Sequence, residues 1–370
     1  MNEQAVVIDN GSGIIKAGYC GEERPKLIFN NYVGRPKHDK VMLTTHDQEL
    51  FLGPECDKNK GLLKLSHPMS HGNIDNWADM EQVYKYIFKE MKASASHHPV
   101  LISEPLENPI SNREKTAEAF FEHMSVPALY FQTQPILSLY AQGKTTGFVL
   151  DCGDGVTQWV SIAEGFAIKG ASSRMDLGGR DVTEYLMLLL RRSGYDFHTS
   201  AEFQIVRNIK EKLWNLWLLP LKESDYKHAE DKNALEYFLP DGSEIKLKSE
   251  HIEAPEILFT PQKIGLEYEG IHEMVVNAIM KCDIDLRSTI FSNLIVAGGT
   301  TAMVKFSERL HKSISKLAPK DVKIKLIAPK NRDISCWIGG STLSALKAFN
   351  EMWITKEEYS EHGVNIFRMH

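Results

Sequence analysis

The stretch Asp9-Asn10-Gly11-Ser12-Gly13 follows a short apolar run, Ala5-Val6-Val7-Ile8, near the beginning of the chain. The pattern returns much later, where Phe148-Val149-Leu150 leads into Asp151-Cys152-Gly153-Asp154-Gly155. Each stretch is typical of a buried strand that ends in a carboxylate and turns through glycines into a second strand. We therefore predict two similar hairpins, one in each half of the chain.

A third glycine-rich stretch resembles the first two. Leu294-Ile295-Val296 runs into Ala297-Gly298-Gly299-Thr300-Thr301, again an apolar strand followed by a tight turn. The strands that return from the first two turns are expected at residues 14–19 and 156–162.

The residues of these turns suit a phosphate ligand. Glycine lets the backbone approach an anion closely, and consecutive N–H groups in a turn can bind one. Lys16, on the strand that leaves the first turn, is placed to reach a phosphate as a point charge. Asp9, Asp151 and Asp154 suit a hydrated divalent cation that bridges to phosphate oxygens. We expect the two hairpins to face each other across a cleft and to hold a nucleotide between them.

A single D-x-G-x-G sequence is most often an ordinary hairpin turn. Two copies, together with a strand followed by Gly-Gly-Thr, make nucleotide binding the better interpretation. The sequence contains neither the P-loop pattern G-x-x-x-x-G-K-[ST] nor a strand–G-x-G-x-x-G–helix unit, so those routes to nucleotide binding have no support.

The composition is that of an ordinary globular protein, with 42% hydrophobic and 25% charged residues among 370. This length suffices for two domains, each with its own core. The formal net charge of −6 leaves no broad positive field, so we expect no nucleic-acid partner. Five scattered cysteines without C-x-x-C spacing favour a reducing compartment over disulfides or a zinc site.

We also expect no membrane insertion and no signal peptide. The first residues have neither a positive segment nor a cleavable apolar one. The most apolar window, residues 213–221, contains Asn215 and Pro220 and is too short to span a bilayer.

Periodicity predicts further elements. Helices are expected at residues 181–190 and 201–213. Strands are expected at residues 236–238, 245–247 and 322–326, the last with its lysines on a solvated face. Residues 239–242 form a turn, and Thr355 with Glu358 forms a capping box that starts the last helix.

Taken together, these positions resemble the superfamily of actin, hexokinase and the heat-shock chaperones, and the chain is similar to actins from residue 5 to residue 363. The similarity is carried by residues 9–16, 32–38, 71–74, 137–140, 151–157, 179–181, 237–242, 297–301 and 337–341. It implies an α/β, actin-like ATPase fold with two ribonuclease H-like domains around a central nucleotide cleft. The implied outer domain is 1–136 with 336–370, where 31–66 is subdomain 2. The implied inner domain is 137–335, where about 178–260 is subdomain 4.

The resemblance also implies the ligands, ATP or ADP with Mg²⁺ or Ca²⁺, and a role for individual residues. The implied nucleotide-binding residues are Gly11, Ser12, Gly13, Lys16, Gly153, Asp154, Gly155, Arg207, Lys210, Glu211, Gly298, Gly299 and Thr300. Asp9, Asp151 and Asp154 are expected to hold the cation through water. The catalytic candidates are Gln134, Asp151 and Gln158, with Gln134 orienting the attacking water.

Several positions depart from the actin pattern. Gln158 stands where actins carry a histidine that helps organise the attacking water, and glutamine cannot supply imidazole acid–base chemistry. Pro135 stands at the hinge between the domains and fixes its own φ. Cys152 replaces a serine that we expect to touch the γ-phosphate. These departures predict at most a slow ATPase.

The base side of the cleft also differs from that of actins. Ala302 and Met303 replace Met-Tyr, Asp333 replaces a lysine that packs on adenine, and Ile334 follows it. We expect weaker affinity or relaxed base choice.

Residues 34–38, 194–198, 285–293 and 318–324 resemble the centractin branch of the actin-related proteins more than conventional actin. This implies a cytoplasmic, cytoskeletal filament subunit that assembles with itself and with other actin-like or dynactin-type subunits, and reaches a dynein adaptor indirectly. Residues 42–49 correspond to the mobile outer loop of actin. Residues 264–266 correspond to its filament plug, although a plain surface loop fits nearly as well.

Two other functions remain open. The chain could be a monomeric actin-related subunit of a larger nuclear or axonemal assembly, with nucleotide as a structural element. It could also be a small-molecule kinase of the same fold, which the extent of the actin-like stretches disfavours.

Overall fold

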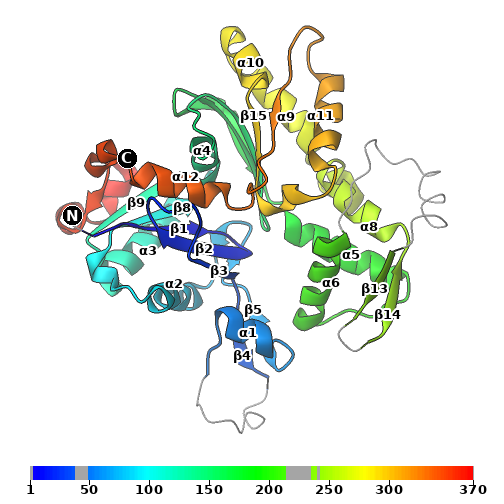
Figure 1. The fold of residues 1–370 in the computed structure, drawn as a ribbon, viewed down its shortest axis with the longest axis horizontal. Coiled ribbons are helices and arrows are strands. Elements are labelled where there is room, and N and C mark those ends of the chain that lie inside the picture. Colours follow the sequence, from blue (N-terminus) through cyan, green and yellow to red (C-terminus); the bar gives the residue numbers. More distant parts are fainter. Residues whose placement is uncertain (1–2, 38–48, 214–234, 240–241, 370) are drawn as a thin grey trace.

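The computed structural model describes residues 3–37, 49–213, 235–239 and 242–369. The predicted outer loop up to residue 48, the turn residues Pro240 and Asp241, and the window after Leu213 lie outside these ranges. Within them the chain builds two central sheets, each covered by helices (Figure 1). We call the half built on the first sheet the first lobe and the other half the second lobe.

The first sheet has the strand order β17-β9-β8-β1-β2-β3. Its strands are β1 (Val6–Asn10), β2 (Ile14–Tyr19), β3 (Leu27–Asn30), β8 (Val100–Glu104), β9 (Ala128–Thr133) and β17 (Ile354–Thr355). The second sheet has the order β12-β11-β10-β15-β16. Its strands are β10 (Gly147–Cys152), β11 (Thr157–Ala163), β12 (Phe166–Met175), β15 (Leu294–Ala297) and β16 (Leu326–Ile327).

The two sheets repeat one topology. In each, a hairpin (β1–β2 or β10–β11) has a third antiparallel strand on one side (β3 or β12). On the other side lie two parallel strands, β8 and β9 or β15 and β16. The predicted hairpins and their return strands are therefore confirmed, and the chain contains the same α/β unit twice.

Side chains of β1 point alternately to opposite faces of the first sheet, as the pleat requires. Val6 and Ile8 pack in a core with α2 (Trp77–Met91), whereas Val7 packs with Trp337 of α12 (Ser335–Ser344). The other elements of the first lobe are α1 (Gly53–Asn59), α3 (Ile110–Glu118), α13 (Lys356–His362), α14 (Ile366–Met369), β4 (Val33–Pro36), β5 (Leu63–Ser66), β6 (Met69–Ser70) and β7 (Asn73–Ile74).

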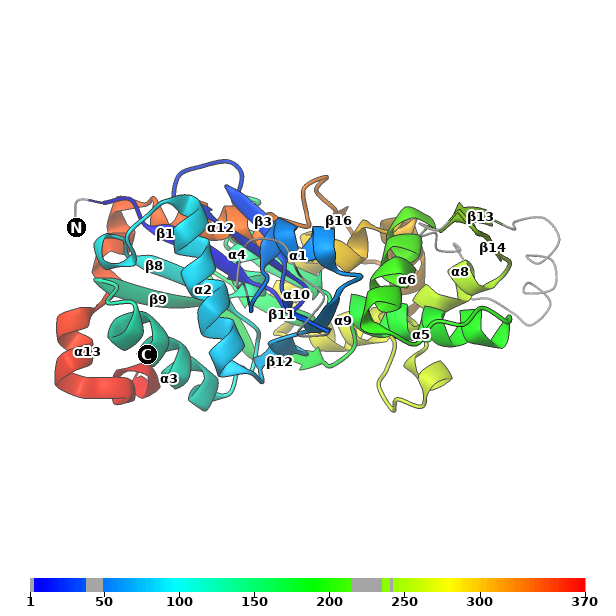
Figure 2. The same ribbon diagram turned by 90° about the horizontal axis from the view of Figure 1, so that it is seen from below.

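β10 shows the same alternation. Phe148 and Leu150 enter the core of the second lobe, and Val149 faces the opposite side with Leu139. The helices and remaining strands of this lobe are α5 (Gly179–Arg192), α6 (Ser200–Leu213), α8 (Glu250–Glu253), α9 (Ile271–Met280), α10 (Ile284–Phe291), α11 (Phe306–Leu317), β13 (Leu235–Phe238) and β14 (Glu244–Leu247). Figure 2 shows α5 and α6 at the far end of the molecule from α13.

Two helices cross between the lobes, α4 (Gln134–Tyr140) and α12. A Cβ atom on Gly339 would lie only 1.7 Å from the carbonyl oxygen of Leu137, so glycine lets the two helix backbones touch. Trp337 of α12 donates from Nε1 to the carbonyl oxygen of Val7 at 3.1 Å, which fixes the crossing helix on β1.

The predicted helices at 181–190 and 201–213 are confirmed as α5 and α6, and the capping box of Thr355 and Glu358 starts α13. The predicted strand at 322–326 is wrong, because only Leu326 belongs to a strand. The predicted alternation of burial does occur, with Lys323 and Lys325 exposed. Pairing with β15 covers only Leu326 and Ile327, and the backbone N–H of Lys325 donates instead to the carbonyl oxygen of Phe291, the last residue of α10.

Candidate functional site

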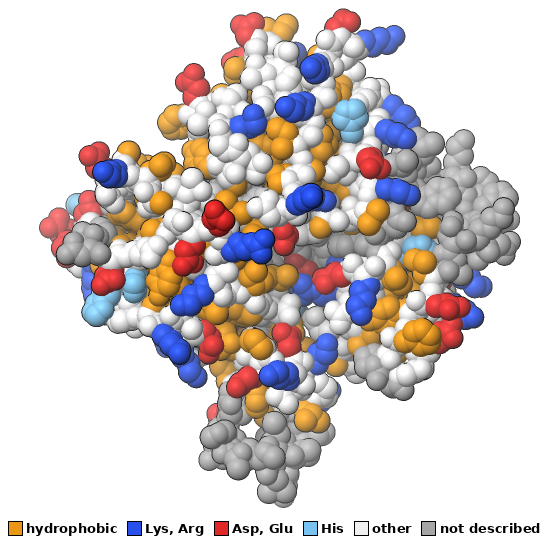
Figure 3. Space-filling model, in the orientation of Figure 1, with side chains coloured by type: hydrophobic (Ala, Val, Ile, Leu, Met, Phe, Trp, Pro, Cys, Tyr) orange, Lys and Arg blue, Asp and Glu red, His pale blue; other side chains and the backbone are white. Residues whose placement is uncertain are grey.

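A cavity of about 540 Å³ lies where the two glycine hairpins approach each other. Figure 3 shows side chains of both charges gathered over the middle of the face seen in Figure 1. The catalytic, nucleotide-binding and cation-binding candidates predicted from the sequence all line this cavity: Asp9, Gly11, Ser12, Gly13, Lys16, Gln134, Asp151, Gly153, Asp154, Gly155, Gln158, Arg207, Lys210, Glu211, Gly298, Gly299 and Thr300. Positions separated by most of the chain therefore converge on one volume.

The turns of the two hairpins touch directly. A Cβ atom on Gly13 would lie 2.5 Å from the Asp154 carboxylate, and one on Gly155 would lie 2.8 Å from Ser12 Oγ. The backbone N–H of Gly72 donates to the same Ser12 Oγ at 2.9 Å. Glycine is thus needed for the approach of the lobes, in addition to the access it gives an anion.

Asp9 lies in a network of the first lobe. Lys16 Nζ donates to its Oδ2 at 2.7 Å, and Ser103 Oγ donates to its Oδ1 at 2.9 Å. Burial lowers the pKa of Lys16, but the charge of Asp9 outweighs this and raises it, so the ammonium is retained. A charged lysine beside the first turn suits a phosphate group.

Among the residues that the structure describes, Asp151 has no such cationic partner at hydrogen-bond distance. Burial, reinforced by the charge of Asp9, raises the pKa of Asp151 to about 6. A divalent cation between Asp9 and Asp151 would offset this repulsion, so these two carboxylates fit the predicted cation. Among the described residues, no group of three or more His, Cys, Asp or Glu side chains is placed to hold a metal ion directly.

Asp154 is held differently from the other two carboxylates. Burial would raise its pKa, but Arg207, Arg180 and Lys210 together lower it. Arg180 lies 3.1 Å from the Asp154 carboxylate and also donates to the carbonyl oxygen of Ser12 at 3.0 Å. Asp154 therefore stays ionised and joins the two lobes through Arg180.

The α6 residues come from the second lobe. Lys210 Nζ donates to the carbonyl oxygen of Gly179 at 2.5 Å, and burial lowers its pKa to about 8. Arg207 donates to Glu211 at 2.9 Å and reaches Asn30 Oδ1 of the first lobe at 3.3 Å. These side chains supply positive charge at the mouth of the cavity between the lobes.

Gln134 and Gln158 contact each other in the lining of the cavity. Gln158 Nε2 donates to Gln134 Oε1 at 2.7 Å and to Asp151 Oδ2 at 3.2 Å. The backbone N–H of Leu106 donates to Gln158 Oε1 at 2.7 Å. The three catalytic candidates therefore form one hydrogen-bonded group.

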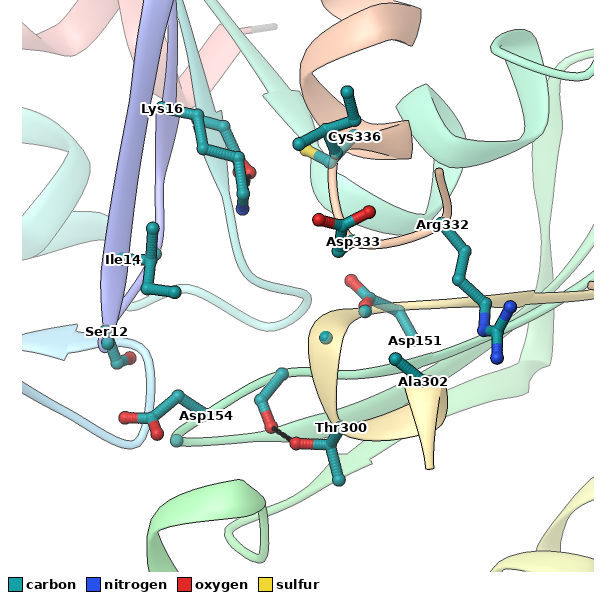
Figure 4. Close-up of a pocket in the computed structure, with 18 of the residues that line it drawn as sticks. Ser12, Ile14, Lys16, Asp151, Asp154, Thr300, Ala302, Arg332, Asp333 and Cys336 are labelled. Atoms are coloured by element: carbon teal, nitrogen blue, oxygen red, sulfur yellow. Dashed lines mark hydrogen bonds and ion pairs between the residues drawn. The ribbon is translucent and has the colours of Figure 1, made fainter. Parts of the chain in front are cut away.

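The opposite end of the cavity is built by the third glycine-rich turn. Gly298 has a φ of +86°, and a Cβ atom there would lie 2.2 Å from the carbonyl oxygen of Cys152. Thr300 Oγ1 donates to the carbonyl oxygen of Gly153 at 2.7 Å, so this turn is tied to the second hairpin. Figure 4 shows Ser12 and Asp154 on one side of the cavity and Ala302 and Arg332 on the other.

The predicted phosphate contact at position 152 is wrong, because the Cys152 side chain lies elsewhere. The Cys152 side chain does not line the cavity and is buried in the core of the second lobe. Since the side chains of β10 alternate in direction, Asp151 faces the cavity and Cys152 faces the opposite side. Cys336 of α12 is the cysteine that lines the cavity.

Sequence reasoning missed other lining residues: Ser138, Lys212, Lys330, Arg332 and Cys336. It also missed the role of Arg180, although the stretch 179–181 carried part of the resemblance. Arg332 donates to the carbonyl oxygens of Thr301 at 3.1 Å and Pro329 at 2.9 Å, and it holds the third turn in place. No local pattern marks these residues, because they meet the site only through tertiary packing.

No helix in the part of the chain that the structure describes is long and apolar enough to cross a membrane. The family model for actin matches residues 1–369 of this chain. The "Actin-like protein" of Neurospora crassa is 45% identical over 367 residues, which cover 98% of this chain and 97% of that protein.

Proposed function

The chain belongs to the actin family and has the actin-like ATPase fold expected from its sequence, and from that premise we propose that its cavity binds ATP or ADP with Mg²⁺ or Ca²⁺. The observation that carries the proposal is the convergence of both glycine hairpins and of Lys16, Lys210 and Arg207 on one cavity. We also propose the domain division 1–136 with 336–370 and 137–335, because the chain passes between the sheets at α4 and α12.

The turns at Gly11–Gly13 and Gly153–Gly155 would hold the β- and γ-phosphates, assisted by Lys16. The third turn would lie close to the α-phosphate and the nucleoside through Gly298, Gly299 and Thr300. Helix α6 would contact the nucleoside through Lys210 and Glu211, assisted by Arg207. Asp9 and Asp151 would hold the cation through water, with Asp154 near the same phosphates. The cation, when bound, would neutralise charge on the phosphate oxygens.

We propose that hydrolysis is slow. In the reaction a water oxygen bonds to the γ-phosphorus while the bond to the bridging β–γ oxygen breaks. The electron pair leaves with ADP, and a water proton passes to phosphate or solvent. Catalysis of this step depends on positioning and on charge neutralisation. A glutamine at position 158 supplies neither an imidazole base nor an acid near neutral pH.

The wider proposal is a cytoplasmic filament subunit of the centractin type, in a dynactin-type complex that supports dynein-based transport. Its support is the likeness of residues 34–38, 194–198, 285–293 and 318–324 to that branch. The partners would be copies of the chain and other actin-like subunits, with a dynein adaptor reached indirectly. The alternative is a monomeric subunit of a larger nuclear or axonemal assembly.

Two measurements test these proposals. Mass spectrometry of nucleotide released from the purified protein should find close to one ADP or ATP per chain, and protein without nucleotide would refute the binding proposal. Sedimentation with ATP and with ADP should pellet the chain as filaments. A chain that stays monomeric at high concentration would favour the alternative.

A further inference from the structure

Gln158 of β11 has both ends of its amide engaged by protein groups. Its Oε1 accepts the backbone N–H of Leu106, and its Nε2 donates to Gln134 and Asp151. Because a backbone N–H can only donate, the contact with Leu106 determines which end of the amide is the oxygen. The side chain is 1% exposed, so water does not compete for these contacts.

Leu106 belongs to the other lobe, in the loop between β8 and α3, and the second sheet holds it on both sides. Gln158 accepts its N–H, while Arg174 donates to its carbonyl oxygen at 3.4 Å. Gln158 and Arg174 are direct partners across β11 and β12. The Leu106 side chain packs against the cluster that contains Val149 and Val160. If Gln158 turned away, it would leave a backbone N–H without this partner, so its position is strongly constrained.

This constraint extends to Gln134 at the start of α4. The Oε1 of Gln134 accepts a hydrogen bond from Gln158 Nε2 at 2.7 Å. Its Nε2 lies 3.4 Å from both the carbonyl oxygen of Asn10 and Ser103 Oγ. A side-chain amide can orient an attacking water by accepting a hydrogen bond from it, and here Gln158 occupies one of the two lone pairs of the accepting oxygen and turns that oxygen toward β11.

We infer that Gln158 is a positioning residue that joins the lobe contact at Leu106 to the orientation of Gln134, and so keeps the acceptor oxygen of Gln134 away from an attacking water. This inference rests on the proposed nucleotide site and deepens it. The Gln158 side chain then has two roles: it holds the lobes together around the nucleotide, and it slows ATP hydrolysis. Loss of Gln158 should therefore speed phosphate release only while Gln134 is present.

The test is a double-mutant cycle on the full-length chain loaded with ATP. Gln158→Met keeps the length of the side chain and removes both polar ends. Gln158→His is the second variant and keeps a polar ring beside Leu106. Each is made with Gln134 intact and with Gln134→Ala. Phosphate release in a single turnover and dissociation of a fluorescent ATP analogue are measured separately.

With Gln134 intact, we expect phosphate release to rise about tenfold or more, which is less than the roughly 10²–10⁴-fold that a positioned general acid or base contributes, because Gln134 only orients the water. In the Gln134→Ala background we expect no rise, because contacting residues are coupled in such a cycle. In Gln158→Met, nucleotide dissociation should quicken in both backgrounds, since the contact with the Leu106 N–H is lost in both. In Gln158→His it should quicken less, since the ring keeps a polar atom beside Leu106. A purely structural role for Gln158 would not make the gain in phosphate release depend on Gln134.

An equal rise in both backgrounds would overturn the inference, because Gln158 would then act without Gln134. An unchanged rate in both, with one nucleotide still bound per chain, would overturn it while leaving the nucleotide site intact. If no variant and no parent protein retained nucleotide, the proposed function itself would fall.

Discussion

The guanidinium of Arg180 lies 3.1 Å from the carboxylate of Asp154, on the second lobe, and donates to the carbonyl oxygens of Ser12 and Met69 on the first lobe at 3.0 and 3.1 Å. One side chain therefore spans the cleft at the end where the two glycine turns meet. It also opposes the burial that would otherwise raise the pKa of Asp154. Arg180 therefore bridges the lobes and, together with Arg207 and Lys210, also favours the ionised form of Asp154.

Replacing Arg180 with Met should speed nucleotide dissociation at least about tenfold, because the loss of even one charge-assisted hydrogen bond costs roughly 1.5–3 kcal/mol. The matched control is Arg192→Met, an exposed position on the same helix, which should leave dissociation unchanged. Dissociation is followed with a fluorescent nucleotide under excess unlabelled ATP. Equal rates for the two variants would show that Arg180 does not hold the cleft closed.

Gly13→Ala should weaken nucleotide binding at least about tenfold and lower the melting temperature. The added Cβ would lie 2.5 Å from the Asp154 carboxylate, and relief of such overpacking typically costs about 1–3 kcal/mol. Gly61→Ala is the control, because a Cβ there has no neighbour within 4 Å. Calorimetric titration with ADP and thermal unfolding measure both effects. Full affinity in Gly13→Ala would mean that the turns need not approach each other as closely.

The two hairpins could be predicted because their signal is local. An apolar strand, a carboxylate and glycines at fixed spacing together specify a strand and the turn that follows it. The convergence of both turns on one cavity followed from their repetition in the sequence. Arg180 and Arg332 gave no such signal, because each acts through backbone carbonyls that are distant in sequence.

Two errors have the same physical origin. Residues 322–325 alternate in burial as a strand does, but alternation reports which side chains face a core and not which backbone groups pair. The resemblance to actins predicts a phosphate contact for the side chain at position 152, yet Cys152 and the cavity-lining Asp151 are neighbours on β10 and face opposite sides. The strand was therefore located correctly and this side chain was misplaced.

The raised pKa of Asp151 predicts a pH-dependent effect of Mg²⁺. In the unfolded chain this carboxyl ionises near its ordinary pKa of about 3.9. In the folded protein its pKa is about 6. Between these values the folded state binds a proton that the unfolded state does not. The free energy of unfolding of the cation-free protein should therefore fall as pH rises through this window, by up to about 3 kcal/mol.

A cation beside Asp151 favours the ionised carboxylate, so Mg²⁺ should raise the melting temperature more at pH 7 than at pH 5. Asp151→Asn should flatten the pH dependence and abolish most of the Mg²⁺ effect. Thermal unfolding of nucleotide-free protein with Mg²⁺ or with chelator measures both. If Mg²⁺ raised the melting temperature equally at pH 7 and pH 5, the cation would not lie beside Asp151.

Asp333 lines the cavity and lies near Asp151 in Figure 4, away from Ser12 and Asp154. Its side chain is exposed, and its carboxylate accepts no hydrogen bond from the residues that the structure describes. Asp333→Lys should slow ADP dissociation about three- to tenfold. The substitution removes a negative charge near a polyanionic ligand, and its aliphatic stem can cover the face of a base. Asp321→Lys makes the same charge change at another exposed position and should alter dissociation by less than about twofold, because screening weakens distant charges. If the two lysine variants retained ADP equally, Asp333 would have no direct part in binding the base.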